Sequence, residues 1–253
     1  MVLTVDCGNT MIKFGLFEED ILKMTFSITT DRNKSSDEYG IILKTLASPD
    51  LFHVKGAIVS SVVPSLTDVL VMAIEKAYHI TSLVVDKNLK TKMPIKIDNP
   101  SELGSDMLCG AIGATRMFSA PVVIADLGTA TKLYVVDKNG CFAGCVITSG
   151  IRSTLKGLLN STSLLLEVPI QFPKKVIGKN TKDSIQSGIL NSQKYLIEDF
   201  AKNFEIELGY PLKKIITGGF SKVLHPKLED YTLVTNLILH GLNEIYKVNS
   251  YEK

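Results

Sequence analysis

Residues 2–15, VLTVDCGNTMIKFG, decide the fold of this chain. The apolar, β-branched run predicts a buried strand that ends at Asp6, and Gly8 permits a sharp turn before a second strand at residues 12–17. The pattern returns at residues 121–131, PVVIADLGTAT, which an alternating stretch at residues 133–136 follows. Two strands that end in Asp-x-Gly, one in each half, predict a duplicated fold with two loops facing one ligand.

The residue types in both loops favour phosphate as that ligand. Gly8 and Gly128 allow close backbone approach, so main-chain N–H groups can hold phosphate oxygens. The side chains of Asn9, Thr10 and Thr129 can add hydrogen bonds to the same oxygens.

The two aspartates of the motif indicate a cation. Asp6 and Asp126 would repel a phosphate by themselves, so their presence suggests a cation between carboxylate and phosphate. Alternatively, Asp-x-Gly at a strand end is simply a tight turn, because Asp and Gly are common turn formers. Two copies at matched strand ends favour the ligand interpretation.

The composition is that of an ordinary globular protein. The chain has 253 residues, of which 45% are hydrophobic and 21% charged, enough for one large domain or two smaller ones. Its net charge of +2, without a basic cluster, argues against a nucleic-acid partner. No signal peptide or apolar run of membrane-spanning length occurs, which predicts a soluble, cytoplasmic protein with no membrane partner.

The four cysteines follow neither Cys-x-x-Cys nor zinc-ligand spacing, which favours reduced thiols that are buried or half-buried. Cys7 lies inside the first predicted phosphate loop, and this position makes it a candidate for oxidation.

Strands and helices alternate along both halves, which predicts the α/β class. Residues 119–121, Ser-Ala-Pro, mark the expected boundary between a first domain at residues 1–118 and a second at residues 119–253. The second domain is expected to end with a helix at residues 233–246.

A capping signal precedes the third predicted helix. Asn99 as N-cap, Pro100 at the first helical position and Glu102 at the third predict a helix that continues to about Met117. Gly104 weakens the start of this helix, so Asp106 could project into a cleft. On spacing alone, a solvated Asp106 that complements the helix dipole is the favoured alternative.

Six motifs in order resemble the type III pantothenate kinase family over nearly the whole chain. They lie at residues 6–15, 98–106, 126–131, 144–150, 178–188 and 217–219. The resemblance implies the fold of actin-like ATPases, sugar kinases and Hsp70: two duplicated, ribonuclease H-like α/β domains with a nucleotide cleft between them. It also implies a homodimer and the transfer of a phosphoryl group from ATP to pantothenate, the first step of coenzyme A biosynthesis.

The resemblance also implies roles for individual residues. Asp106 corresponds to the catalytic base, and Asp126 to the position that binds a monovalent cation, potassium or ammonium, in addition to the magnesium that accompanies ATP. Pantothenate would contact Ile97, Gly104, Ser105, Asp106, Met107 and Thr181. ATP would contact Asp6, Cys7, Gly8, Asn9, Thr10, Met11, Ile12, Lys13 and Thr129.

The chain departs from the family pattern at its substrate motifs. Met107 replaces the arginine expected to hold the substrate carboxylate, and Ile97 replaces a tyrosine. The loss of a bidentate arginine should weaken carboxylate binding, because methionine offers neither charge nor donors. Further departures are Lys132 for threonine, Tyr134 for aspartate, Cys145 for glycine and Ser149 for proline.

Several hypotheses follow from these departures. Lys132 could supply the missing positive charge to the substrate, or it could be an exposed strand residue. The chain could instead phosphorylate another small hydroxyl compound, or act as a catalytically weak regulator that binds a nucleotide or metabolite.

Overall fold

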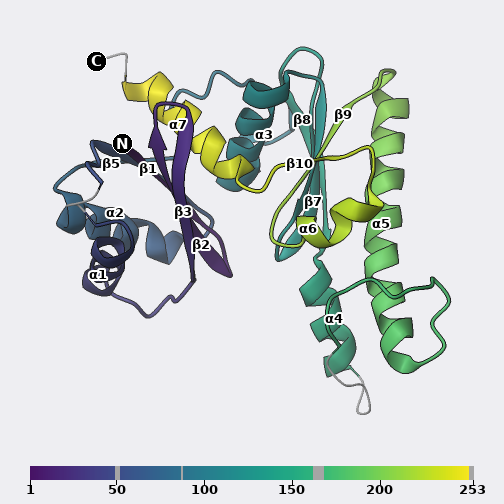
Figure 1. The fold of residues 1–253 in the computed structure, drawn as a ribbon. Helices are drawn as coiled ribbons and strands as arrows, with labels where there is room; N and C mark the ends of the chain where they lie inside the picture. The colour runs from purple at the N-terminus through teal and green to yellow at the C-terminus, as the bar shows by residue number, and fades with distance from the viewer. Residues whose placement is uncertain (49–51, 87, 162–167, 251–253) are drawn as a thin grey trace. The chain divides into compact units, whose positions relative to one another are not determined.

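The computed structural model describes residues 1–48, 52–86, 88–161 and 168–250, which fold as two compact units (Figure 1). The first unit comprises Met1–Met117 together with Leu237–Lys253, and the second comprises Phe118–Asn236. Each unit contains a five-stranded sheet and flanking helices. The α/β class expected from the sequence is therefore confirmed.

The two sheets share one topology. In the first, strands run in the order β3-β2-β1-β4-β5, and in the second, the matching order is β8-β7-β6-β9-β10. In both, three antiparallel strands are followed by two strands that run parallel to the central one. This match confirms the predicted duplication. The strands are β1 Val2–Cys7, β2 Met11–Glu18, β3 Ile21–Thr29, β4 Gly56–Ser61, β5 Ser82–Val84, β6 Val122–Leu127, β7 Ala130–Val136, β8 Phe142–Ser149, β9 Lys213–Thr217 and β10 Thr232–Leu233.

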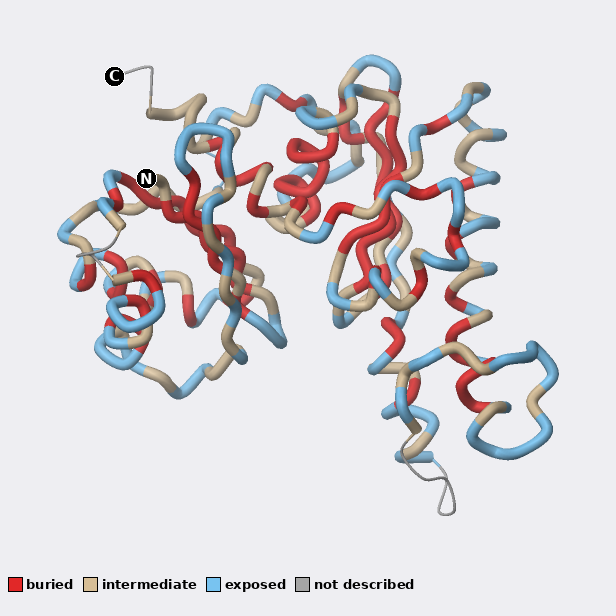
Figure 2. Tube along the Cα trace, viewed as in Figure 1, coloured by how far each residue is buried: buried red, intermediate tan, exposed pale blue. Residues whose placement is uncertain are grey.

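Alternate residues of β1 pack against helices on the two opposite faces of the first sheet. Leu3 and Val5 belong to the core formed with α1 (Ser36–Leu46) and α2 (Pro64–Tyr78). The opposite face is covered by α7 (Leu237–Ser250), which contacts β1, β2 and β4. Figure 2 shows that the central strands of both sheets and most of α3 (Ser105–Phe118) are buried.

The second unit has its own core. Apolar residues of β6, β7 and β9 pack against α4 (Ile151–Asn160) and the long helix α5 (Thr181–Leu208). The short segments α6 (Ser221–Leu224) and η2 (His225–Lys227) complete this unit before β10.

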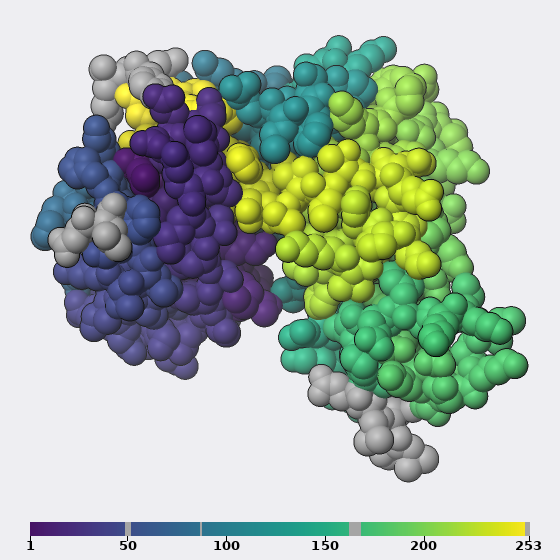
Figure 3. Space-filling model, viewed as in Figure 1, coloured from purple at the N-terminus to yellow at the C-terminus, as the bar shows by residue number. Residues whose placement is uncertain are grey.

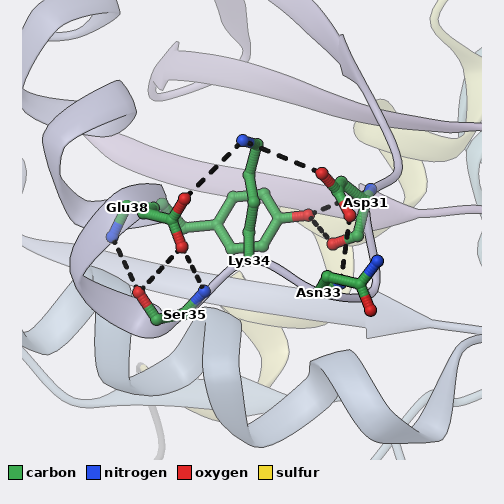
Figure 4. Close-up of polar contacts among 6 residues, drawn as sticks. Asp31, Asn33, Lys34, Ser35 and Glu38 are labelled. Carbon is green, nitrogen blue, oxygen red and sulfur yellow. Dashed lines mark hydrogen bonds and ion pairs between the residues drawn. The ribbon is translucent and has the colours of Figure 1, made fainter.

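A polar cluster fixes the start of α1 (Figure 4). The Ser35 hydroxyl accepts from the Glu38 backbone N–H, and the Glu38 carboxylate accepts from the Ser35 N–H, which forms a complete capping box. The Tyr39 hydroxyl donates to the Asp31 carbonyl at 2.7 Å. These bonds hold the segment that joins β3 to α1 in a defined conformation.

The structure corrects the predicted start of the third helix. Asn99 caps a separate 3₁₀ turn, η1 (Pro100–Glu102), where its side chain accepts from the Ser101 N–H. Leu103 is extended, with φ −69° and ψ 117°, and this conformation interrupts the helix. The α-helix proper therefore begins at Ser105.

The last helix differs from expectation in both its start and its unit. It begins at Leu237 rather than residue 233, and it belongs to the first unit rather than to the domain expected at residues 119–253. Figure 3 shows yellow atoms of α7 at the upper left against the purple N-terminal strands. Asn243 Nδ2 anchors it by donating to the Glu19 carbonyl at 2.7 Å.

Two glycines let α7 approach α3 closely. A Cβ added to Gly241 would lie 1.8 Å from the Cys109 carbonyl oxygen, and one added to Gly113 would lie 2.4 Å from the Leu237 carbonyl oxygen. Backbone meets backbone at this contact, so neither helix can yield by changing a rotamer.

We expect Gly241→Ala to lower the free energy of unfolding by about 1–3 kcal/mol, the usual cost of overpacking. Gly188→Ala is the matched control, because an added Cβ meets no atom within 4 Å in α5 and alanine favours helix. Urea denaturation of both variants provides the comparison. Equal stability of the two variants would contradict the close contact.

Candidate active site

The first hairpin places Asp6 beside a short exposed loop. Asp6 lies at the end of β1, is 8% exposed and stands opposite Lys13 in the β1–β2 register. The Gly8 N–H donates to the Met11 carbonyl at 3.0 Å, which closes the turn. Asn9 and Thr10 are exposed at its tip. Gly8, Asn9 and Thr10, which the sequence predicts to hold phosphate, thus lie in the turn of this hairpin.

The segment after β3 braces this loop. Thr30 donates from its N–H to the Thr10 carbonyl at 3.0 Å and from its hydroxyl to the Gly8 carbonyl at 2.7 Å. Arg32 Nη2 donates to Asn9 Oδ1 at 3.0 Å. Sequence reasoning missed both residues. The alternating apolar residues at 21–28 offered the signal, because they indicate a third strand whose end must lie beside the first turn.

The start of α3 is joined to the same edge of the first sheet. The Ser60 hydroxyl, at the end of β4, donates to the Ser105 hydroxyl at 2.8 Å, and Ser60 pairs with Asp6 in the β1–β4 register. Burial raises the pKa of the Cys109 thiol well above its usual value, and the charges of Asp6 and Asp106 raise it further. The structure therefore brings Asp6 and Asp106 to one region of the first unit.

Local backbone geometry orients the Asp106 carboxylate. Its Oδ1 accepts from the Met107 N–H at 2.8 Å. A Cβ at Gly104 would lie 2.7 Å from that same oxygen. Any residue other than glycine would therefore displace the carboxylate. A glycine and an aspartate two residues apart thus work as a pair.

The predicted substrate residues in the first unit differ in exposure. Met107 is 6% exposed, so its side chain offers little surface to a ligand. Ile97 and Ser105 are half-buried. The positive charge expected at position 107 is replaced here by an apolar side chain in the core.

The second hairpin repeats the arrangement with a shorter turn. Asp126 ends β6 and is 6% exposed, and the Gly128 N–H donates to the Ala130 carbonyl at 3.0 Å. Thr129 is exposed at the tip. Its carbonyl accepts from the Gly150 N–H at 3.2 Å and from the Ser153 hydroxyl at 2.8 Å. The start of α4 therefore fixes the second loop.

The Thr-Gly-Gly turn at the end of β9 packs against Asp126. Gly218 has φ +93°, and a Cβ there would lie 2.6 Å from Asp126 Oδ1. The Phe220 N–H donates to the Leu127 carbonyl at 3.1 Å. Glycine is required at position 218 both for its conformation and for the space it leaves.

Lys132 forms an ion pair with Asp126. The distance from its Nζ to Asp126 Oδ2 is 2.9 Å, and the two side chains are 13% and 8% exposed. The interpretation of Lys132 as an exposed strand residue is therefore wrong. A monovalent ion within about 4 Å of this ammonium would be repelled by about 4 kcal/mol at an effective dielectric constant of about 20, which cancels the attraction of the carboxylate at a similar distance. The residues present do not fit the monovalent cation that the resemblance implies.

The remaining predicted residue, Thr181, is exposed at the first position of α5, which Asn180 caps. The predicted site residues thus fall into two sets, one in each unit.

A separate pocket of about 330 Å³ in the second unit contains none of the predicted site residues. It is lined by Arg152, Leu155, Lys156, Leu159, Val168, Pro169, Ile170 and Phe220.

Solved structures with a similar fold place the chain in a broad class. A Campylobacter jejuni protein described as a Baf family transcriptional activator matches with a TM-score of 0.64 and 18% identity, over 98% of this chain and 99% of that one. The Clostridium difficile activator of 2-hydroxyisocaproyl-CoA dehydratase, with bound ADPNP, matches with a TM-score of 0.54 and 11% identity, over 99% and 96% of the two chains. The fold is that of the actin-like ATPases and sugar kinases.

Sequence comparison narrows the class to one family. Residues 2–203 match the type III pantothenate kinase family. The type III pantothenate kinase of Agathobacter rectalis is 34% identical over 252 residues, which cover 98% of this chain and 97% of the relative. The chain belongs to the type III pantothenate kinase family.

Within the described part of the chain, no helix combines the length and the apolar character needed to cross a membrane.

The cysteines differ in burial, and this difference predicts which thiols can react. Cys7 and Cys109 are fully buried, and burial raises the pKa of each thiol. Cys145 is exposed on β8, so the expectation of buried or half-buried thiols is wrong for this residue. Partial burial raises its pKa, and the charge of Lys132 acts in the opposite direction. The placement of Cys7 argues against its role as an oxidation-sensitive site.

We expect iodoacetamide to modify Cys145 first in the native protein at about pH 8, because alkylation needs an accessible thiolate. Cys7 and Cys109 should react only after denaturation. Peptide mass spectrometry over time gives the order. Rapid native labelling of Cys7 would show that the first loop opens more readily than its hydrogen bonds indicate.

Proposed function

We propose that this chain transfers the γ-phosphoryl group of ATP to the hydroxyl group of pantothenate and so performs the first step of coenzyme A biosynthesis. Membership of the type III pantothenate kinase family, with 34% identity over nearly the full length of a relative, is the observation that carries the proposal. Kinases of this family use ATP with a divalent cation.

The two hairpin loops are proposed to hold the phosphates of ATP. Both expose short turns with polar side chains, Asn9 and Thr10 in one and Thr129 in the other, and the glycine N–H of each turn holds the turn closed. Magnesium would neutralise charge on the transferring phosphoryl group. Phosphoryl transfer depends mainly on positioning and charge neutralisation, so preformed loops and a cation supply most of what it needs.

Asp106 is proposed as the general base. Its carboxylate would accept the proton of the pantothenate hydroxyl as that oxygen bonds to the γ-phosphorus and the bond to ADP breaks. The hydrogen bond from the Met107 N–H and the space left by Gly104 support this role, because they fix the direction of the carboxylate.

One observation favours a second acceptor. The buried Met107 offers no charge to a carboxylate, so a small hydroxyl compound without that carboxylate is an alternative substrate. The family resemblance further supports a cytoplasmic homodimer, and the net charge of +2 gives no reason to expect a nucleic-acid or membrane partner.

The purified protein should convert pantothenate to 4′-phosphopantothenate in the presence of magnesium ATP, with the product detected directly by mass. Asp106→Asn should lower kcat by roughly 10²–10⁴-fold, the usual contribution of a positioned base, and leave ATP affinity unchanged. Asp68→Asn, an exposed carboxylate on α2 of the same unit, is the matched control.

Near-normal turnover by Asp106→Asn would refute the role of the base. Faster turnover of neutral amide analogues than of pantothenate by the wild-type protein would favour the second acceptor.

We expect Gly104→Ala to lower kcat by roughly 10–100-fold, because the new methyl group must displace the Asp106 carboxylate by about 1 Å. Gly157→Ala introduces the same group in α4, where no atom lies within 4 Å, and should leave kcat unchanged. Steady-state kinetics and thermal melts of both variants separate lost positioning from lost stability. A fully active Gly104→Ala would show that the carboxylate direction does not matter.

A further inference from the structure

We propose that the Lys132 ammonium replaces the monovalent cation at Asp126, so that nucleotide binding by this chain is independent of potassium and ammonium. The inference rests on the proposed function in one respect, namely that the second loop binds the phosphates of ATP. It concerns how the charge beside that loop is supplied.

The ion pair is built into the hairpin. Asp126 and Lys132 are direct partners in the antiparallel β6–β7 register, so their side chains leave the sheet on the same face. Nζ lies 2.9 Å from Oδ2, which is the distance of a charge-assisted hydrogen bond. Because both side chains are largely buried, solvent and salt screen the pair much less than a surface pair.

The backbone on the other side of Asp126 is equally fixed. Gly218, with φ +93°, lies against the carboxylate so closely that a Cβ would reach within 2.6 Å of Oδ1. A strand partner and a glycine turn therefore hold the carboxylate and its cation beside the loop that carries Thr129. Preorganised charge of this kind needs no ion to enter before the nucleotide binds.

The first hairpin shows the same design. There, Asp6 at the end of β1 stands opposite Lys13 on β2, just as Asp126 stands opposite Lys132. Each copy of the duplicated unit thus combines an aspartate, a glycine turn and a lysine on the returning strand. Lys132 makes the second hairpin equivalent to the first in charge.

The charges also balance without an ion. In the arrangement that the resemblance implies, one carboxylate, an uncharged threonine and one monovalent cation sum to zero. Here Asp126 and Lys132 sum to zero by themselves. An added potassium ion would leave an excess positive charge in a largely buried place, which is unfavourable.

The wild-type protein provides the first test. Binding of magnesium ADP is measured by calorimetry in potassium, ammonium or tetramethylammonium chloride, each at an ionic strength of about 0.15 M. We expect dissociation constants that agree within about twofold, since no ion is taken up with the nucleotide. Potassium-dependent tightening by roughly tenfold or more would overturn the inference.

Melting temperatures of the ligand-free protein in the same salts test the ion pair without any nucleotide. Equal values support the inference, and a specific increase in potassium overturns it. If magnesium ADP binds in none of the salts, the proposed function fails, and the melting temperatures still decide whether Lys132 replaces the ion.

Three variants test the lysine itself. Lys132→Thr should weaken nucleotide binding by roughly tenfold or more in tetramethylammonium, and potassium should restore it. Lys132→Arg keeps the charge, so its nucleotide binding should remain independent of potassium. This variant still tests the inference if Lys132→Thr does not fold without the ion. Lys138→Met removes an exposed lysine from the turn between β7 and β8 and serves as the control.

A different result would assign the lysine to the substrate. If Lys132→Thr leaves nucleotide binding unchanged in every salt and raises only the KM for pantothenate, the ammonium serves the substrate carboxylate. That outcome would overturn the inference.

Discussion

The register of one antiparallel hairpin in each unit is the constraint on which the rest of the structure depends. In an antiparallel pair, the turn and the alternation of side chains together decide which residues stand opposite one another. Here they set Asp6 against Lys13 and Asp126 against Lys132, with a short glycine turn beyond each pair. A slip of one residue in the returning strand would turn its lysine to the other face of the sheet, away from the aspartate.

Much of this could be predicted from the sequence, because hairpins, caps and short helices are specified by neighbouring residues. The duplication and the two loops were evident from repeated Asp-x-Gly motifs at strand ends. The break before α3 was not, because Asn99, Pro100 and Glu102 are equally good at starting a 3₁₀ turn, and only the extended Leu103 ends it. Local capping residues predict where a helix can begin, but they do not predict how long it continues.

Features that depend on distant contacts were harder to predict. The sequence gives α7 an apolar face but no sign of which sheet it covers, and its place in the first unit follows from Gly113 and Gly241, whose partners lie far along the chain. Lys132 could be read as a solvated strand residue, because alternation alone does not reveal that its ammonium is turned toward Asp126. Comparison with the family located the substitution, and the geometry showed what it faces.

The placement of α7 makes the second unit, Phe118–Asn236, an insertion within the first. During synthesis, at about 5–20 residues per second, the inserted unit leaves the ribosome complete while the face of β1, β2 and β4 that α7 covers is still bare. The first unit is therefore completed after the second. An apolar sheet face stays open to chaperones, or to a wrong partner, until α7 has been added.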